Sequence, residues 1–289
     1  MTASFPQSPP SDLCRALPTL LSGETPVRWE KLSGGRTNAA WRGHLQDRDI
    51  VLKLYRDRSQ NPLFPNLPEA EANLLEYLRG TGLAPALLGT LNTPDARCNV
   101  YSHIPGTVWR QGTGDVARMM RRLHGLAVPA GLRACANGSR ALLQQAEAIL
   151  DACNHTPLPA SLRPACDIAP IGDTVLLHGD IVPGNLISND NGLHLIDWQC
   201  PAIGDPCEDI AIFLSPAMQQ VYRGGPLTGQ EIDTFLAAYG APEITARYRA
   251  LAPVYHWRMA AYCQWKMEHG SPEYARGLEL ERAALYDAT

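Results

Sequence analysis

The chain has 289 residues, of which 45% are hydrophobic and 19% charged, and its formal net charge is −4. This length and hydrophobicity are ample for a folded core in one large domain or in two lobes. The weak negative charge does not indicate a nucleic-acid partner. No apolar run approaches the ~20 residues of a membrane-spanning helix, so no membrane partner is predicted either.

The first residues and the cysteines indicate the cellular compartment. Residues 1–26 form a lead-in rich in Ser and Pro with a short amphipathic helix at 12–22, and they lack the basic start and the apolar core of a signal peptide. The eight cysteines form no C-x-x-C pair and show no zinc-type spacing with histidine. We therefore expect a cytoplasmic protein with reduced thiols.

Residues 27–104 are predicted to form a lobe of five strands and one helix, because short apolar runs alternate there with turn residues. The expected strands are residues 27–32, 39–45, 50–55, 87–91 and 99–104. An apolar stripe of leucines at helical spacing predicts a helix over 69–79. Helical patterns dominate the rest of the chain, so we expect residues 105–289 to form a second, mainly helical lobe.

A glycine-rich turn with Gly34 and Gly35 joins the first two predicted strands. Walker A and Rossmann loops are excluded, since both require a helix after the glycines. A glycine-rich turn between two strands can still cover nucleotide phosphates with its backbone N–H groups. A plain hairpin turn is the alternative interpretation.

Lys53 is one of only three lysines in the chain, and it lies inside the apolar run of the third predicted strand. An ammonium group there can neutralise nucleotide phosphates if a carboxylate holds it in place. The helix at 69–79 offers Glu69, Glu71 and Glu76. We favour Glu71 because it lies on the leucine side of the helix. The alternatives are a lysine at a strand edge and three solvated glutamates.

A sharp break follows the fifth predicted strand. Ile104 is followed by Pro and Gly, a pattern typical of a hinge. The backbone around Ser102 and Ile104 could hydrogen-bond a nucleotide base. The loop over residues 56–68 is rich in Asn and Pro, and its sequence does not decide whether it closes over a nucleotide.

Residues 175–198 carry the polar residues around which the chain is organised. A short strand leads to His178 and Asp180, Asn185 follows five positions later, and a hairpin with a turn at 189–192 ends at Asp197. A tight hairpin brings its ends together, so we expect Asp180, Asn185 and Asp197 to meet at one edge. Oxygen ligands of this kind suit Mg²⁺, and the remaining carboxylate can orient a hydroxyl proton.

Two later segments add supporting residues. Asp205 is expected to cap a helix that has Pro206 at its first position, and Asp209 is expected to brace the catalytic loop one turn later. A long helix at 242–268 places Trp257, Trp265 and Glu268 along one side. Such an aromatic stripe is either core or a cation–π wall for a cationic substrate.

Taken together, these motifs resemble those of the small-molecule kinases of the aminoglycoside phosphotransferase and choline kinase superfamily. The most specific are L-L-H-G-D-I-V-P-G-N-L-I, then H-L-I-D-W, then G-D-P-x-E-D-I-A. The resemblance implies an α+β, bilobal, protein-kinase-like fold, with a five-stranded antiparallel sheet plus helix in the first lobe and a catalytic hairpin in the second. It also implies ATP, sometimes GTP, as phosphate donor.

The resemblance implies a role for each motif residue. Asp180 would orient and deprotonate the acceptor hydroxyl, and Asn185 and Asp197 would bind Mg²⁺. Lys53, held by Glu71, would contact the α- and β-phosphates. His178 would brace the loop.

Some residues depart from the protein-kinase pattern. Asp197, Trp198 and Gln199 replace D-F-G, no A-P-E segment follows, and the glycine-rich turn is not G-x-G-x-x-G. These departures argue against a protein kinase that is switched by phosphorylation of an activation loop.

The acceptor is expected to be a cationic alcohol such as choline, ethanolamine or thiamine. The residues proposed to contact it are Trp198, Trp257, Trp265 and Glu268. An aminoglycoside kinase of the same fold is the alternative within enzymes. A pseudokinase is the alternative outside enzymes, and the presence of Lys53, Asp180, Asn185 and Asp197 argues against it. The sequence does not indicate the oligomeric state.

Overall fold

A computed structural model describes residues 6–32, 38–55, 61–93, 96–155 and 158–287. The chain forms two compact units, one made of residues up to 107 together with 187–200, the other of 108–186 together with 201–289. The predicted glycine-rich turn with Gly34 and Gly35 lies outside the described residues, as does the first part of the 56–68 loop. None of the described helices combines the length and the apolarity needed to cross a membrane.

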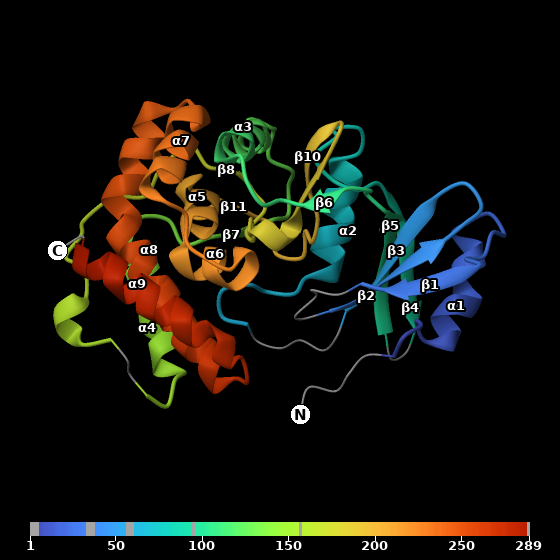
Figure 1. The fold of residues 1–289 in the computed structure, drawn as a ribbon, viewed down its shortest axis with the longest axis horizontal. Coiled ribbons are helices and arrows are strands. Elements are labelled where there is room, and N and C mark those ends of the chain that lie inside the picture. The colour runs from blue at the N-terminus through green and yellow to red at the C-terminus, as the bar shows by residue number, and fades with distance from the viewer. Residues whose placement is uncertain (1–5, 33–37, 56–60, 94–95, 156–157, 288–289) are drawn as a thin grey trace. The chain divides into compact units, whose positions relative to one another are not determined.

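The first unit is built on a five-stranded antiparallel sheet (Figure 1). Its spatial order is β1-β2-β3-β5-β4. The strands are β1 (Arg28–Lys31), β2 (Ala39–His44), β3 (Asp49–Tyr55), β4 (Leu87–Thr93) and β5 (Ala96–Ser102). All five predicted strands are present, so the predicted sheet is confirmed.

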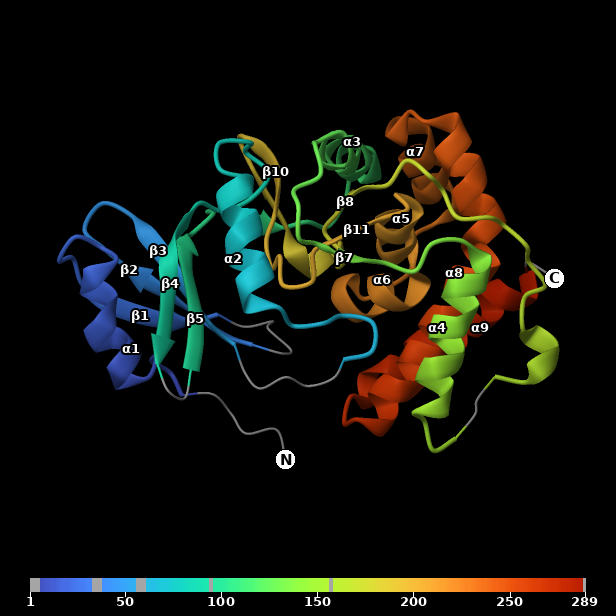
Figure 2. The ribbon, with the colours of Figure 1, turned by 180° about the vertical axis from the view of Figure 1, so that it is seen from behind.

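The two faces of this sheet pack against different helices, α1 (Ser11–Ala16) and α2 (Pro68–Tyr77). They lie on opposite sides of the sheet in Figure 1 and Figure 2. Because side chains alternate along a strand, Ile50 and Leu52 join the apolar core that includes residues of α1. Lys53 alternates with them and therefore faces the α2 side.

The predicted hairpin forms from β9 (Leu186–Asn189) and β10 (Gly192–Leu195), and the short β6 (Thr107–Val108) extends it on the β9 side. Residues 187–200 were expected in the second lobe, but they belong to the first unit. One contact that joins them to this unit is a hydrogen bond: the Leu195 N–H donates to the Leu83 carbonyl at 2.7 Å.

The second unit is mainly helical. Its helices are α3 (Thr113–His124), α4 (Ser139–Asp151), α5 (Cys207–Leu214), α6 (Pro216–Arg223), α7 (Gly229–Tyr239), α8 (Pro242–Glu268) and α9 (Ala275–Asp287). Short 3₁₀ turns are η1 (Leu17–Thr19) in the first unit and η2 (Ala160–Leu162), η3 (Pro183–Asn185) and η4 (Pro272–Tyr274) in the second. The long α8 packs against α4, α5 and α9, while α3 packs against α7 (Figure 1). The α+β fold class predicted from the sequence is confirmed.

The second unit also contains a small three-stranded sheet, one strand of which leads into the loop proposed to be catalytic, residues 178–185. Its strands are β7 (Arg133–Ala134), β8 (Val175–Leu177) and β11 (Ala202–Gly204), with β11 in the middle. β8 ends immediately before His178, so the pairing of β8 with β11 fixes where the catalytic loop begins.

Helix α7 begins with a capping box. The Thr228 hydroxyl accepts from the Glu231 N–H, and the Glu231 carboxylate accepts from the Thr228 N–H. The Arg223 guanidinium also donates to Glu231 at 2.7 Å. Hydrogen bonds from Arg223 and from the Thr228 backbone lower the pKa of Glu231 from 4.5 to about 2.

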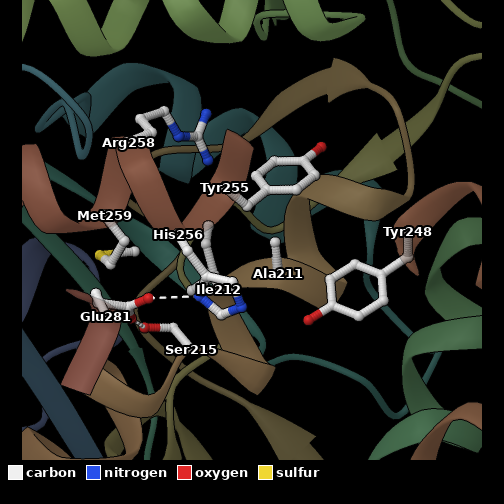
Figure 3. A pocket seen from close by; sticks show the side chains of 9 residues that line it. All are labelled: Ala211, Ile212, Ser215, Tyr248, Tyr255, His256, Arg258, Met259 and Glu281. Atoms are coloured by element: carbon white, nitrogen blue, oxygen red, sulfur yellow. Dashed lines mark hydrogen bonds and ion pairs between the residues drawn. The ribbon is translucent and has the colours of Figure 1, made fainter. Parts of the chain in front are cut away.

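A polar cluster lies between α5, α6, α8 and α9 beside a small cavity (Figure 3). The fully buried Glu281 accepts hydrogen bonds from the Ser215 hydroxyl, from the Ala217 N–H at 3.1 Å and from His256 at 2.6 Å. The cavity has a volume of about 10 Å³, room for a single water but not for a substrate. The cluster therefore has a structural role, joining three helices through one carboxylate.

Replacing Glu281 by alanine removes the shared acceptor of this cluster. Because buried donors are then left unpaired, we expect the free energy of unfolding to fall by about 3 kcal/mol in urea denaturation. Glu279→Ala on the same helix is the matched control, since Glu279 is exposed and pairs on the surface with Arg276 three residues earlier. The control should change stability by less than about 0.5 kcal/mol. Equal losses in both variants would contradict the assigned role.

The capping box predicts a pH dependence. A carboxyl group with a lowered pKa in the folded state contributes stability above its unfolded pKa, and that contribution is lost as pH falls from 4.5 towards 2. Glu231→Gln should therefore lower stability at pH 7 and flatten the acid branch of the stability curve, measured by denaturation at each pH. Glu243→Gln, at an exposed position in the first turn of α8, should keep the wild-type slope.

Candidate functional site

Lys53 lies on the α2 face of β3 and is almost fully buried, with 3% of its surface exposed. Its ammonium group forms an ion pair with Glu71 of α2 at 2.6 Å and a second one with Asp197. The other two glutamates of α2 lie elsewhere: Glu69 pairs with Arg97 on the surface, and Glu76 pairs with an arginine of its own helix. The glutamate that pairs with Lys53 is thus Glu71, as helical spacing predicted.

Two residues behind this ion pair were missed by the sequence analysis. The Tyr55 hydroxyl donates to the Glu71 carboxylate, and the Asn99 amide donates to the Tyr55 oxygen at 2.8 Å. The same amide donates to the carbonyl of Pro68, the first residue of α2, at 3.0 Å. The only signal in the sequence was strand alternation, which places Tyr55 on the same face as Lys53.

Burial and charge act in opposite directions on these groups. Burial alone would lower the pKa of Lys53, but attraction to Asp197 and Glu71 outweighs it and raises the pKa above its ordinary value. Burial also raises the pKa of Tyr55, and the Glu71 charge adds to this effect. Lys53 is therefore charged, and Tyr55 keeps the proton that it donates to Glu71.

Asp197 has an unusual backbone. It follows β10 and has a φ of 65°, in the left-handed region that few residues other than glycine adopt. Such a conformation costs on the order of 1–3 kcal/mol and persists only where neighbouring contacts hold it. Its carboxylate is partly exposed, and one of its oxygens pairs with Lys53.

In the second unit, the structure brings Asp180 and Asn185 together. The Asn185 amide nitrogen donates to the Asp180 carbonyl at 2.9 Å and to its carboxylate at 3.1 Å. The amide oxygen of Asn185 consequently points away from Asp180, which is the orientation that a metal ligand requires. The expected meeting of these two residues with Asp197 stays a prediction.

Asp209 anchors the catalytic loop. Its carboxylate accepts from the His178 N–H at 3.0 Å and from the Gly179 N–H at 2.8 Å, and it also contacts the His124 ring at 3.2 Å. His178 in turn accepts from the Asp180 N–H at 3.2 Å through its ring nitrogen. One fully buried carboxylate thus fixes the backbone on which Asp180 is carried.

Asp205 lies one position further from its helix than predicted. α5 begins at Cys207, and Pro206 before it already has helical angles. The Asp205 carboxylate still accepts from the Cys207 N–H at 3.0 Å, and it pairs with Arg247 of α8 at 2.7 Å. Asp205 therefore contributes to the start of α5 and ties it to α8.

The aromatic residues proposed to contact the acceptor lie in different environments. Trp198 is fully buried and donates to the Leu195 carbonyl, and Trp257 is 3% exposed. Trp265 stacks on His269 with 4.1 Å between the ring centroids. Trp257 and Trp265 thus do not form one open wall along α8, and the burial of Trp257 agrees with the core interpretation of the stripe. Acceptor contact by any of them stays a prediction.

Glu268 at the end of α8 is occupied by local hydrogen bonds. Its carboxylate accepts from the Asn154 N–H at 2.6 Å and from the His155 N–H at 3.0 Å. These backbone bonds, together with one from the Gln264 side chain, lower its pKa to about 2. The observed contacts give Glu268 a role in holding the loop after α4.

The hinge residues are partly engaged in the sheet. The Ser102 N–H donates to the Ala86 carbonyl, and the Ser102 hydroxyl accepts from the Ala86 N–H. The Ser102 N–H is therefore already paired within the sheet. Ile104 lies beyond the end of β5 and is half-buried.

The donor set suits a hard cation bound together with phosphates. Within the described ranges, no group of three or more His, Cys, Asp or Glu side chains can hold a metal ion by itself. Mg²⁺ does not require such a group, because it binds through one or two protein oxygens, substrate phosphates and water. The Asn185 amide oxygen and the Asp197 carboxylate have the chemistry for this kind of site.

Comparison with known proteins adds a family match. Residues 28–253 match the model of the phosphotransferase enzyme family. A search of curated protein sequences finds no significant match.

Solved structures with the same fold include several phosphotransferases. A choline/ethanolamine kinase family protein from Mesorhizobium loti aligns with a TM-score of 0.66 at 17% identity, over 96% of this chain and 94% of that one. Spectinomycin phosphotransferase, in complex with ADP and spectinomycin, aligns with a TM-score of 0.60 at 15% identity over 98% of both chains. Choline kinase from Cryptosporidium parvum Iowa II gives 0.60 at 15% identity over 90% of both chains. At these identities the likeness shows the fold alone.

Asp209→Asn tests the anchor of the catalytic loop. An amide has one acceptor oxygen where the carboxylate has two, so one of the two loop N–H groups loses its partner. We expect the exchange protection of the His178 and Gly179 amides to fall about 10- to 100-fold, the equivalent of about 1–3 kcal/mol. Asp233→Asn, at an exposed position on α7, is the control. Unchanged protection in Asp209→Asn would contradict the assignment.

Proposed function

The chain belongs to the phosphotransferase enzyme family, whose model spans residues 28–253, and from this premise we propose that it transfers the γ-phosphate of ATP to a hydroxyl group of a small molecule. The observation that supports this most is the buried ammonium of Lys53 held between the carboxylates of Glu71 and Asp197. A buried lysine paired in this way is costly to maintain for stability alone. It is well suited to binding phosphate oxygens.

Lys53 is proposed to contact the α- and β-phosphates of the nucleotide. Glu71 and Tyr55 hold the lysine side chain on the α2 face of the sheet, so little rearrangement is needed when a phosphate binds. Such preorganisation is a main source of catalysis in phosphoryl transfer, where positioning and charge neutralisation dominate. The nucleotide base would bind at the Ser102 carbonyl and the Ile104 backbone, and Gly34 and Gly35 would cover the phosphates.

Asp180 is proposed as the catalytic base. The Asn185 amide orients its carboxylate, and Asp209 holds the loop that carries it, so the carboxylate can accept the proton of the acceptor hydroxyl. Asn185 and Asp197 would hold Mg²⁺. When bound, the ion would neutralise charge that develops on the transferred phosphoryl group.

The acceptor is proposed to be a cationic alcohol such as choline, ethanolamine or thiamine. Support comes from two similar structures whose names are choline/ethanolamine kinase family protein and choline kinase. An aminoglycoside acceptor is the second candidate, because similar structures also include spectinomycin phosphotransferase with its antibiotic bound.

The deciding experiment measures ADP release from Mg-ATP, and GDP release from Mg-GTP, with a panel of acceptors: choline, ethanolamine, thiamine and several aminoglycosides. Asp180→Ala is the blank for each acceptor. Turnover with one acceptor that the blank lacks identifies the reaction and the acceptor class. ADP release that is equal in wild type and blank across the panel, with ATP still bound, would contradict phosphotransfer to these acceptors and favour a nucleotide-binding pseudokinase.

Two substitutions should separate chemistry from nucleotide binding. Asp180→Asn is expected to lower kcat by about 10²- to 10⁴-fold and to leave the Kd for ATP within about threefold, because it removes only the proton acceptor. Lys53→Met is expected to weaken ATP binding as well, measured by calorimetric titration. The controls are Asp173→Asn, at an exposed position before β8, and Lys31→Met on β1. A Kd unchanged by Lys53→Met would remove Lys53 from the phosphate site.

A further inference from the structure

The segment Asp197–Gln199 replaces the D-F-G motif of protein kinases, and its contacts explain how Asp197 keeps its strained backbone. Trp198, the next residue, is fully buried, and its indole N–H donates to the Leu195 carbonyl at 2.9 Å. This contact closes a tight loop across Asp197 from the β10 side. It leaves open what holds the other side of the segment.

Gln199 holds the other side through both its backbone and its side chain. Its carbonyl accepts from the Leu67 N–H at 2.9 Å, and its side-chain oxygen accepts from the Asn38 amide at 2.7 Å. Gln199 and Asn38 are 5% and 6% exposed, so this is a buried hydrogen bond between residues 161 positions apart. A buried amide is costly to leave unpaired, which makes the contact specific.

Asn38 is itself fixed by a third amide. Its side chain exchanges two hydrogen bonds of 2.9 Å with the side chain of Asn66. We call Asn38, Asn66 and Gln199 the amide clamp. Asn38 immediately precedes β2, and Asn66 comes just before α2, the helix that carries Glu71. The clamp therefore joins the segment after Asp197 to the two elements that flank the Lys53–Glu71 pair.

We propose that Asn38 and Gln199 are positioning residues that hold the Asp197 carboxylate where it can bind both Lys53 and a metal ion. The proposal rests on the proposed function, because it gives the clamp a role in metal-assisted nucleotide binding. A left-handed conformation persists only where surrounding contacts hold it, and its loss would move the Asp197 carboxylate relative to Lys53. The bond between Trp198 and Leu195 spans Asp197, and the clamp holds Gln199 two positions beyond it.

The chemistry of the clamp has a consequence for regulation. Amide side chains neither titrate nor accept a phosphoryl group, so the clamp keeps its hydrogen bonds over the whole physiological pH range. In this chain the segment after Asp197 is thus held by neutral contacts within the first unit. An ordering event such as phosphorylation of an activation loop is not needed to place it.

The test compares the affinity for AMP-PNP with and without Mg²⁺ by calorimetric titration, because this ratio reports the metal site without turnover. In Gln199→Met, which keeps the side-chain length but removes the acceptor, we expect the Mg²⁺-dependent gain in affinity to fall about 3- to 10-fold, the effect of one buried hydrogen bond. Metal-free affinity should stay within about twofold. Asn38→Leu should give the same result, and the double variant should lose no more than either single variant, since the residues act as a unit.

Ser215→Ala is the control for a general loss of stability. It removes a helix cap and a hydrogen bond to Glu281 in the second unit, so it should destabilise the protein without changing the Mg²⁺-dependent gain. A wild-type gain retained in Gln199→Met and Asn38→Leu would overturn the clamp proposal alone. A wild-type protein without affinity for AMP-PNP would instead refute the proposed nucleotide-dependent function.

Discussion

The buried charge of Lys53 is the constraint on which the first unit depends. An ammonium group in the interior is tolerated only when it is paired, and here it binds two carboxylates from different parts of the chain. Glu71 brings α2 against the sheet, and Asp197 brings in the segment after the hairpin. The ion pairs therefore explain why residues 187–200 fold with the first unit although they are far from it in sequence.

The second unit uses the same principle with a buried carboxylate in place of an ammonium. Asp209 is fully buried and is satisfied by two backbone N–H groups of the catalytic loop. In both units the groups proposed for chemistry are held by a buried, paired polar residue: Lys53 pairs with Asp197, and Asp209 holds the loop that carries Asp180. Such support limits the motion of reactive side chains, and positioning of this kind accounts for much of the rate enhancement in phosphoryl transfer.

The similar structures share a fold at low sequence identity, from a choline/ethanolamine kinase family protein at 17% to spectinomycin phosphotransferase at 15%. The acceptors in their names differ widely, from choline and ethanolamine to the antibiotic spectinomycin. A fold of this kind fixes the geometry for moving a phosphoryl group and leaves the acceptor to local residues.

The sequence by itself determined the strands, most helices, the family resemblance and the pairing of Lys53 with Glu71. These follow from local periodicity, which fixes the face of a strand or helix on which a residue lies. Only the tertiary structure decided which side chains from other segments contact that face. Tyr55 and Asn99 behind Glu71, the burial of Trp257, and the bond between Asn38 and Gln199 all depend on contacts between distant segments. Side-chain partners across 161 residues leave no periodic signal, because packing selects them only after the elements have formed.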